Sequence, residues 1–202
     1  MSLRPTPTWR FASIVYCPQD DVSAALALAV GHLRRAGLRV GGLMQRFGRE
    51  IAPGKREMLV EVLHSGEVIR LHDPRGRGVM GCMLDSDGLA RAAMAFRTAA
   101  MSRPDLLLAG RFGKQEVAGT GLRAELAEAL ISGVPVLVPV RTDHFGPWQN
   151  FVGGPTEVLA PEPRAILEWA DLHCRLPTDS TRRVLPTRQP IGSLLPLGRV
   201  TP

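Results

Sequence analysis

The sequence predicts a single three-layer α/β domain with a mostly parallel sheet and an inserted β-hairpin. Short apolar runs alternate with longer runs of helical periodicity, as they do in βαβ units. A chain of 202 residues with 45% hydrophobic and 22% charged residues has the size and composition of one globular domain. We expect a flexible arm over residues 1–9, a folded body over 10–176 and a Pro- and Arg-rich tail over 178–202.

The first part of the body predicts a complete β-α-β unit. Residues 11–17 form an apolar strand candidate, and residues 22–36 place apolar side chains at helical spacing behind a capping Asp20 or Asp21. Residues 38–45 form a second buried strand, in which two consecutive glycines indicate the close approach of another element.

The middle of the body predicts a hairpin followed by a helix and the central strand. Residues 58–70 alternate apolar and polar side chains on either side of His64-Ser65-Gly66, the pattern of a hairpin with one solvent-facing side. A helix over 88–101 then ends before Pro104, and residues 105–109 form the central strand.

The remaining elements follow a polar, glycine-rich loop, RFGKQEVAGTG, at residues 111–121. Because this loop follows a parallel strand, we expect it at the edge of the sheet where ligands bind in open α/β folds. The later elements are a helix over 122–132, strands over 135–140 and 157–159, and a helix over 163–176.

The formal net charge of +6 does not by itself indicate nucleic-acid binding, and we expect none. Half of the excess lies in the tail, and the remaining basic residues alternate with acidic ones in helical segments. No apolar run approaches the roughly 18 residues of a membrane span, and the first residues lack a signal-type apolar core. We therefore expect a cytoplasmic protein without membrane insertion.

The cysteines and histidines predict neither a disulfide framework nor a metal site. Three cysteines are widely spaced without a CxxC pair, and five histidines are scattered without metal-ligand spacing. Reduced thiols are expected. Trp148 and Phe151 are expected to pack under a loop rather than to stack on a base.

A resemblance to a known family rests on the loop after the central strand. The strand DLLLA followed by GRFGKQE resembles the segment that follows the Walker B strand in the thermophile-type nucleoside-triphosphatases of the P-loop fold, with Gly113, Lys114 and Glu116 in register. The wider pattern GGLMQR, GCMLD, RFGKQE and PVLVPV is similar to an uncharacterised bacterial family, a domain of unknown function related to these hydrolases, over residues 11–176. Members of that family often lie beside molybdate-transport genes. The resemblance implies a P-loop-like fold.

The sequence departs from the hydrolase pattern at both of its phosphate-handling motifs. A P-loop needs GxxxxGK(S/T) to cradle phosphates, whereas this chain has YCPQDDVS, in which Asp20 and Asp21 add negative charge. At the end of the central strand, Gly110 and Arg111 stand where the hydrolases have an Asp for Mg²⁺ and a Glu for water. Both Walker motifs are therefore degenerate, and neither a bound Mg-nucleoside triphosphate nor ordinary hydrolysis is expected.

The substituted loop predicts a site for a small anion, such as a molybdate- or tungstate-related oxyanion. Guanidinium, ammonium and exposed amide groups match tetrahedral oxyanions, and no catalytic residue is assigned. The candidate anion-binding residues are Gly110, Arg111, Gly113, Lys114, Gln115, Glu116, Gln45, Arg46, Cys82 and Asp85. Cys17, Gln19 and Asp20 of the first loop complete the set.

Three other interpretations stay open on the sequence. In the first, Arg111, Lys114 and Glu116 form only a surface ion-pair cluster, and Cys82 is a buried apolar residue. In the second, the protein binds or hydrolyses a nucleotide with an atypical phosphate site, with Glu116 or Asp85 as a displaced base. In the third it is a non-catalytic scaffold whose Arg-rich tail binds an acidic protein partner.

Overall fold

The computed structural model describes residues 10–72 and 85–174, which form an α/β body around one sheet. Within these residues the sheet has seven strands in the spatial order β4-β3-β2-β5-β6-β1-β7. Their bounds are β1 Phe11–Tyr16, β2 Val40–Ala52, β3 Lys55–Val62, β4 Val68–Arg70, β5 Leu106–Ala109, β6 Val136–Arg141 and β7 Glu157–Leu159. β5 lies fourth of the seven, so the predicted central strand is confirmed.

The sheet is mostly parallel, as predicted. β1 pairs in parallel with β6 and β7, and β5 pairs in parallel with β2 and β6. β3 and β4 extend the β2 edge as antiparallel strands and connect through the turn at His64-Ser65-Gly66. The predicted hairpin is therefore confirmed.

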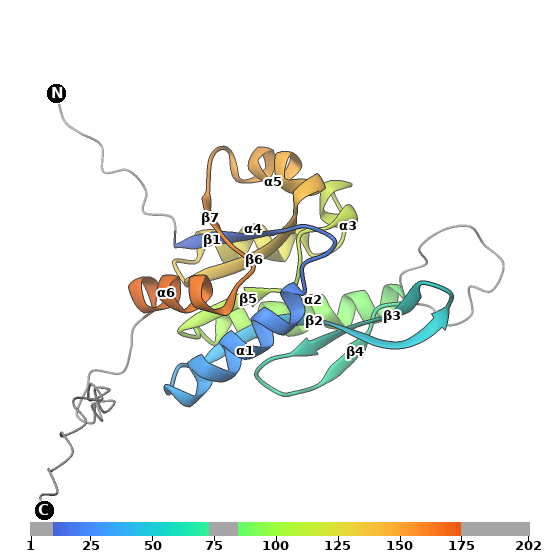
Figure 1. Ribbon diagram of the computed structural model, residues 1–202, viewed down its shortest axis with the longest axis horizontal. Helices are drawn as coiled ribbons and strands as arrows, with labels where there is room; N and C mark the ends of the chain where they lie inside the picture. Colours follow the sequence, from blue (N-terminus) through green and yellow to red (C-terminus); the bar gives the residue numbers. More distant parts are fainter. Residues whose placement is uncertain (1–9, 73–84, 175–202) are drawn as a thin grey trace, which may run out of the picture.

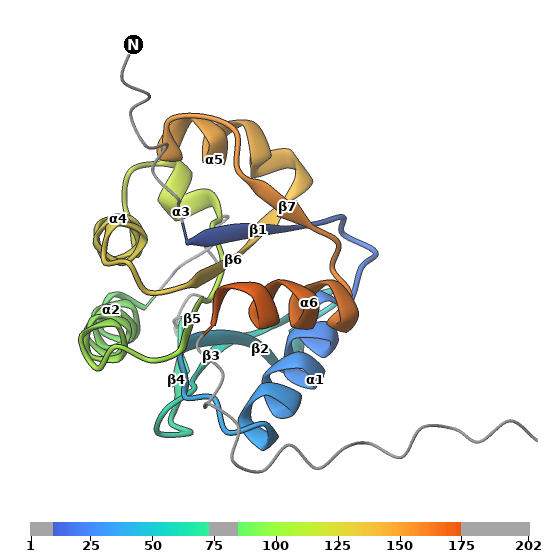
Figure 2. The ribbon, with the colours of Figure 1, turned by 90° about the vertical axis from the view of Figure 1, so that its left-hand side faces the viewer.

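Helices cover both faces of this sheet (Figure 1). α1 and α6 lie on one face, and α2 and α4 lie on the other (Figure 2). The helical bounds are α1 Val22–Arg35, α2 Ser86–Met101, α3 Lys114–Val117, α4 Arg123–Ile131, α5 Phe145–Val152 and α6 Pro163–His173, with a 3₁₀ turn, η1, at Thr142–His144. None of the helices in the two described stretches combines the length and the apolar character needed to cross a bilayer.

Each face of the sheet buries its own apolar core because successive strand residues point to opposite faces. In β1, Phe11 packs in the core with α2, α4 and α5, whereas Ile14 packs with α1 and α6. Trp148 of α5 is fully buried, and its indole N–H donates to the Ser13 hydroxyl oxygen at 2.6 Å. The predicted packing role of Trp148 is confirmed.

The two central parallel strands β2 and β5 approach closely at the paired glycines of β2, as expected. Gly42 has φ +95°, and a Cβ atom there would lie 2.1 Å from the carbonyl oxygen of Leu108. Only glycine has both the conformation and the space that this contact requires.

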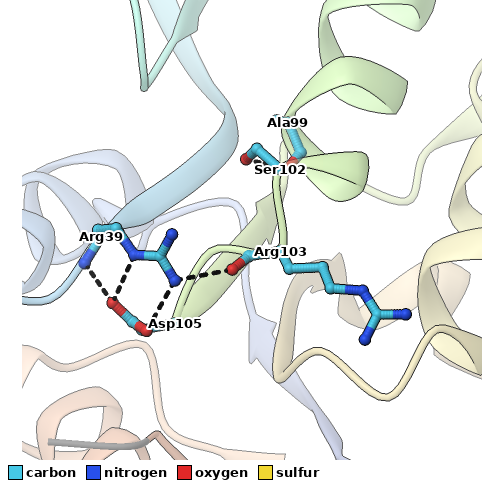
Figure 3. A network of polar contacts seen from close by, with 5 residues as sticks. All are labelled: Arg39, Ala99, Ser102, Arg103 and Asp105. Carbon is cyan, nitrogen blue, oxygen red and sulfur yellow. Dashed lines mark hydrogen bonds and ion pairs between the residues drawn. The ribbon is translucent and has the colours of Figure 1, made fainter.

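The amino ends of the same two strands are joined by Arg39 and Asp105 (Figure 3). The Arg39 amide donates to the Asp105 carboxylate at 2.8 Å, and its guanidinium donates to the same carboxylate at 3.3 Å. Burial raises the pKa of Asp105, but these hydrogen bonds outweigh it and leave the pKa below its usual value. The guanidinium also donates to the Arg103 carbonyl at 2.9 Å.

Three local expectations were wrong in extent. β2 continues to Ala52, well past the predicted end at Gln45, and forms a second hairpin with β3. The loop at residues 111–121 contains the short helix α3, and the GPWQNFVGG segment forms most of α5 rather than a loop.

Candidate functional site

A cleft of about 230 Å³ opens at the carboxyl ends of four parallel strands, beside the first turn of α1. Side chains and backbone from β1, the β1–α1 loop, α1, β2, β5 and β6 meet there. The lining residues are Tyr16, Pro18, Asp20, Asp21, Val22, Ser23, Leu26, Gln45, Phe47, Gly110, Arg111, Pro139 and Arg141.

The topology of the sheet explains this position. The chain leaves β1 into α1 on one face and leaves the neighbouring β6 into α5 on the opposite face. Adjacent strands whose helices go to opposite faces leave a crevice beyond their carboxyl ends, the usual ligand site of open α/β sheets. The loop after β5 was predicted at this edge, and its first two residues, Gly110 and Arg111, lie in the cleft.

Arg111 is the basic residue of the cleft that lacks an acidic partner. Its guanidinium donates from Nε and from Nη2 to the side-chain oxygen of Gln45. It forms no ion pair with any carboxylate in residues 10–72 or 85–174. A half-buried cation bonded only to a neutral amide oxygen retains its attraction for an anion.

Backbone contacts on both sides of Arg111 fix its place. The Gly110 amide donates to the Leu43 carbonyl at 2.9 Å, and the Phe112 amide donates to the Pro139 carbonyl at 3.0 Å. The Phe112 side chain is fully buried against Trp148. Gly110 has φ +58°, a left-handed conformation that directs the chain out of β5 toward the cleft.

The other basic residue of the cleft, Arg141, already has an anionic partner. Its Nε donates to Asp143 Oδ1 at 2.6 Å, and Nη2 donates to the other carboxylate oxygen. The hydrogen bond that Arg141 donates to Asp143 raises the pKa of Arg141 and lowers the pKa of Asp143. Arg141 therefore has less charge available for a ligand than Arg111.

Acidic side chains line the opposite side of the cleft, at the start of α1. Asp20 Oδ2 accepts from the Cys17 amide at 2.7 Å, which shapes the β1–α1 loop. Asp21 is the N-cap of α1 and accepts from the Ala24 amide at 3.0 Å, as one of the two capping expectations had it. The cleft thus contains both signs of charge.

The structure places four of the predicted site residues in the cleft lining: Gly110, Arg111, Gln45 and Asp20. Glu116 instead holds the loop together. It is 8% exposed, and its carboxylate oxygens accept from the Gly113 amide at 2.9 Å and from the Leu122 amide at 3.0 Å. Gln115 bonds to Thr120, and Lys114 is exposed at the start of α3, so neither belongs to the lining.

The remaining predicted residues lie elsewhere or outside the described residues. Arg46 forms an ion pair with Glu61 of β3 at 2.7 Å, and Asp85 caps α2. Cys17 and Gln19 belong to the first loop but are not among the lining residues, and Cys82 lies outside the described residues.

The interpretation of Arg111, Lys114 and Glu116 as a surface ion-pair cluster is not supported. Glu116 is buried on backbone amides, and Arg111 is bonded to Gln45. In the described part of the chain, no three His, Cys, Asp or Glu side chains are grouped so that they could hold a metal ion. Cys174 is buried, and its burial raises the pKa of the thiol to about 12.

Sequence reasoning missed three side chains that shape the cleft: Tyr16, Phe47 and Arg141. Tyr16 and Arg141 are register partners on neighbouring parallel strands, which alternation alone could have placed together had the strand order been known. Phe47 was missed because β2 was expected to end at Gln45. Tyr16 is 7% exposed, and its hydroxyl makes no hydrogen bond with any described residue.

Comparison with known proteins gives one family and one characterised relative. A family described as "Protein of unknown function (DUF2478)" matches residues 11–169. The chain is 41% identical over 160 residues to a protein of Bradyrhizobium diazoefficiens named "Molybdenum import ATP-binding protein ModC 2". That alignment covers 79% of this chain and 18% of the relative, so the chain spans about a fifth of the relative's length. No solved structure matches the chain.

Proposed function

The chain belongs to the family described as "Protein of unknown function (DUF2478)", and from this premise we propose that its body is a P-loop-like module that binds a small anion in the cleft at Arg111. The ligand class that we propose is a molybdate- or tungstate-related oxyanion. The proposal does not include conventional nucleoside-triphosphate hydrolysis.

The guanidinium of Arg111, which has no acidic partner among the described residues, is the observation that carries this proposal. A planar fork of N–H donors matches the oxygens of a tetrahedral anion, and the only hydrogen-bond acceptor that Arg111 has among the described residues is the neutral oxygen of Gln45. An anion entering the cleft would replace or share that bond and neutralise a partly desolvated charge. Such a charge-assisted bond contributes about 1.5–3 kcal/mol.

The residues around the cleft argue against a magnesium-bound triphosphate as the ligand. The β1–α1 loop has no GxxxxGK(S/T), and the Asp21 carboxylate already occupies the Ala24 amide at the start of α1. The end of β5 presents Gly110 and Arg111, so it offers no carboxylate to Mg²⁺. The end of β5 therefore does not fit the metal that conventional P-loop hydrolases hold there.

The molybdenum context comes from the relative rather than from the cleft. The name of the Bradyrhizobium protein links it to molybdenum import, and the sequence match supports a shared ligand class for the common segment. The same name also contains ATP binding, so the alternative of a nucleotide site with an atypical phosphate contact is included in the experiment below. The remaining alternative is a non-catalytic scaffold whose Arg-rich tail, residues 178–202, binds an acidic partner, and deletion of the tail tests it by partner capture.

Titration calorimetry of the full chain tests the anion site. Molybdate, tungstate, sulfate and phosphate are titrated into wild type, Arg111→Ala and Arg164→Ala, with ATP and GTP plus Mg²⁺ as further ligands. We expect at least one oxyanion to bind wild type, and Arg111→Ala to bind it at least about tenfold more weakly because a charge-assisted bond is lost.

Arg164 is the matched control because it is an exposed arginine on α6 that forms an ion pair with Glu168 and does not line the cleft. Arg164→Ala should bind as wild type does. The proposal fails if none of the oxyanions binds wild type, or if Arg111→Ala binds as tightly as wild type. Tighter binding of Mg-ATP than of every oxyanion would favour the nucleotide alternative.

A further inference from the structure

The cleft at Arg111 has two chemically different ends. Arg111 and Arg141 contribute positive charge from the ends of β5 and β6, and Asp20 and Asp21 contribute negative charge from the β1–α1 loop. A bare oxyanion uses only the first end and is repelled by the second. A water molecule needs only about 10–15 Å³ of such space, so a volume of about 230 Å³ holds far more than one tetrahedral anion.

The acidic end has free acceptors. Asp20 uses Oδ2 on the Cys17 amide, and Asp21 uses Oδ1 on the Ala24 amide. The second oxygen of each carboxylate makes no hydrogen bond with any residue in 10–72 or 85–174. Two free carboxylate oxygens side by side in the chain match two N–H donors on one edge of a ligand.

Two aromatic residues also line the cleft, Tyr16 at the end of β1 and Phe47 in the second half of β2. Phe47 of β2 is 47% exposed although it is a large apolar side chain. Tyr16 is almost fully buried, yet its hydroxyl has no partner within the described residues. An exposed ring is a face on which a planar group can stack, and the Tyr16 hydroxyl, which is not fully enclosed and bonds to none of the described residues, can form a hydrogen bond with a ligand.

From this arrangement we infer that the cleft takes a planar heteroaromatic compound that carries an anionic group and an edge with two N–H donors. The ring stacks on Phe47, the donor edge faces Asp20 and Asp21, and the anionic group lies at Arg111. The 2-amino-4-oxo ring shared by guanine and pterin compounds has this donor edge. The inference rests on the proposed anion site and names the class of molecule to which the anion belongs.

The test compares ligands that carry the anionic group, the donor edge or both. GMP, IMP, pterin-6-carboxylate and orthophosphate are titrated into the wild-type full chain. GMP or pterin-6-carboxylate, or both, should bind at least about tenfold more tightly than orthophosphate, and IMP, which lacks the 2-amino donor, should bind about tenfold more weakly than GMP. Whichever of GMP and pterin-6-carboxylate binds more tightly shows whether the ring is a guanine or a pterin.

Two variants separate the ends of the cleft. Asp20→Asn retains an acceptor for the Cys17 amide but removes the charge. It should weaken binding of the complete ligand about tenfold and leave orthophosphate unchanged or bind it a few-fold more tightly because repulsion is removed. Phe47→Ala should weaken only the ring compounds, about fivefold or more.

Ile51→Ala is the matched control for Phe47→Ala. Ile51 lies on the same strand with the same 47% exposure but is not among the lining residues. The Ile51→Ala variant should bind every ligand as wild type does.

The outcomes distinguish this inference from the proposed function. If an oxyanion binds through Arg111 while neither ring compound binds more tightly than orthophosphate, the two-ended ligand is wrong and the anion site stands. Equal binding of IMP and GMP, or parallel losses for orthophosphate and GMP in Asp20→Asn, would also overturn it. If ring compounds bind equally to wild type and Arg111→Ala, this inference is overturned, whereas the proposed function fails only if no oxyanion binds through Arg111.

Discussion

At the scale of single residues, the loop after β5 separates two tasks between neighbours. Arg111 presents a cation to the cleft, whereas Glu116, five positions on, is buried and holds the loop by its carboxylate. Arg123 extends the same anchoring, because its guanidinium donates to the Glu116 carbonyl at 2.8 Å and lies 4.2 Å from the centre of the Phe151 ring. Glu116 therefore has a structural role in this loop.

Glu116→Gln should lower the free energy of unfolding by about 2 kcal/mol. The side-chain NH₂ of the glutamine would replace one of the two carboxylate oxygens. The backbone N–H that now donates to that oxygen would then lose its acceptor. Urea denaturation measures the change. Glu128→Gln, an exposed position on α4, is the control and should change stability by less than about 0.5 kcal/mol.

An unchanged unfolding midpoint in Glu116→Gln would contradict this structural assignment.

The sequence predicted part of the cleft lining but not the composition of the whole site. Arg111, Gln45 and Asp20 follow strands whose carboxyl ends were predicted, so topology alone brought them together. Lys114 and Glu116 were assigned from their place in a motif, and a motif does not determine which side of a short helix faces a cleft. Arg46 was assigned to the site, but it forms an ion pair with Glu61 of β3. Sequence reasoning did not place β3 beside β2 as an antiparallel neighbour.

At the scale of elements, β2 determines most of the architecture. Its first part pairs in parallel with β5, and its second part runs past the end of β5 and pairs in antiparallel with β3. The overhanging part places Gln45 and Phe47 at the cleft. The close backbone contact at Gly42 sets the register on which this overhang depends.

Gly42→Ala should destabilise the protein by about 3 kcal/mol or more, because a Cβ atom would clash with the Leu108 carbonyl and the backbone is left-handed. Thermal denaturation followed by circular dichroism measures the effect. Gly31→Ala makes the same substitution inside α1, where no atom lies within 4 Å of the added Cβ.

This control should stabilise the protein by up to about 1 kcal/mol through helix propensity. Equal melting temperatures for the two alanine variants would refute the proposed contact.

Most elements were predictable because their apolar periodicity survives in the fold. The parallel strands and the helices α1, α2, α4 and α6 bury the side chains that define that period. The extension of β2 escaped prediction because RFGREIA mixes charges and glycine with only two large apolar residues, Phe47 and Ile51, and both are exposed. α5 escaped it because glycine and proline stand in its first turn.

At the scale of the whole molecule, stability depends on joining the amino ends of the two central strands. Asp105 receives the Arg39 amide and guanidinium, and its pKa is lower in the folded protein than its usual value of 3.8. A carboxyl group with a lowered pKa stabilises the fold above its unfolded pKa, and this contribution is lost as the pH falls through the folded value.

Asp105→Asn should therefore be less stable than wild type by about 1 kcal/mol at pH 7, and this difference should shrink below about pH 4. Urea denaturation at pH 7 and pH 2.5 measures both. Asp171→Asn is the control, because Asp171 is exposed and makes no hydrogen bond within the described residues. A gap between Asp105→Asn and wild type that does not change with pH would rule out the linkage.

The order of the strands also bears on whether copies of this body can associate through the edges of their sheets. The outermost strands of the sheet, β4 and β7, have three residues each, so within the described residues each border offers few free backbone groups to a foreign strand. A sheet with such short edge strands resists open-ended self-association even at a high local concentration of the protein. Such a body is suited to form one domain of a larger polypeptide. A segment 41% identical to it makes up 18% of the length of a larger protein.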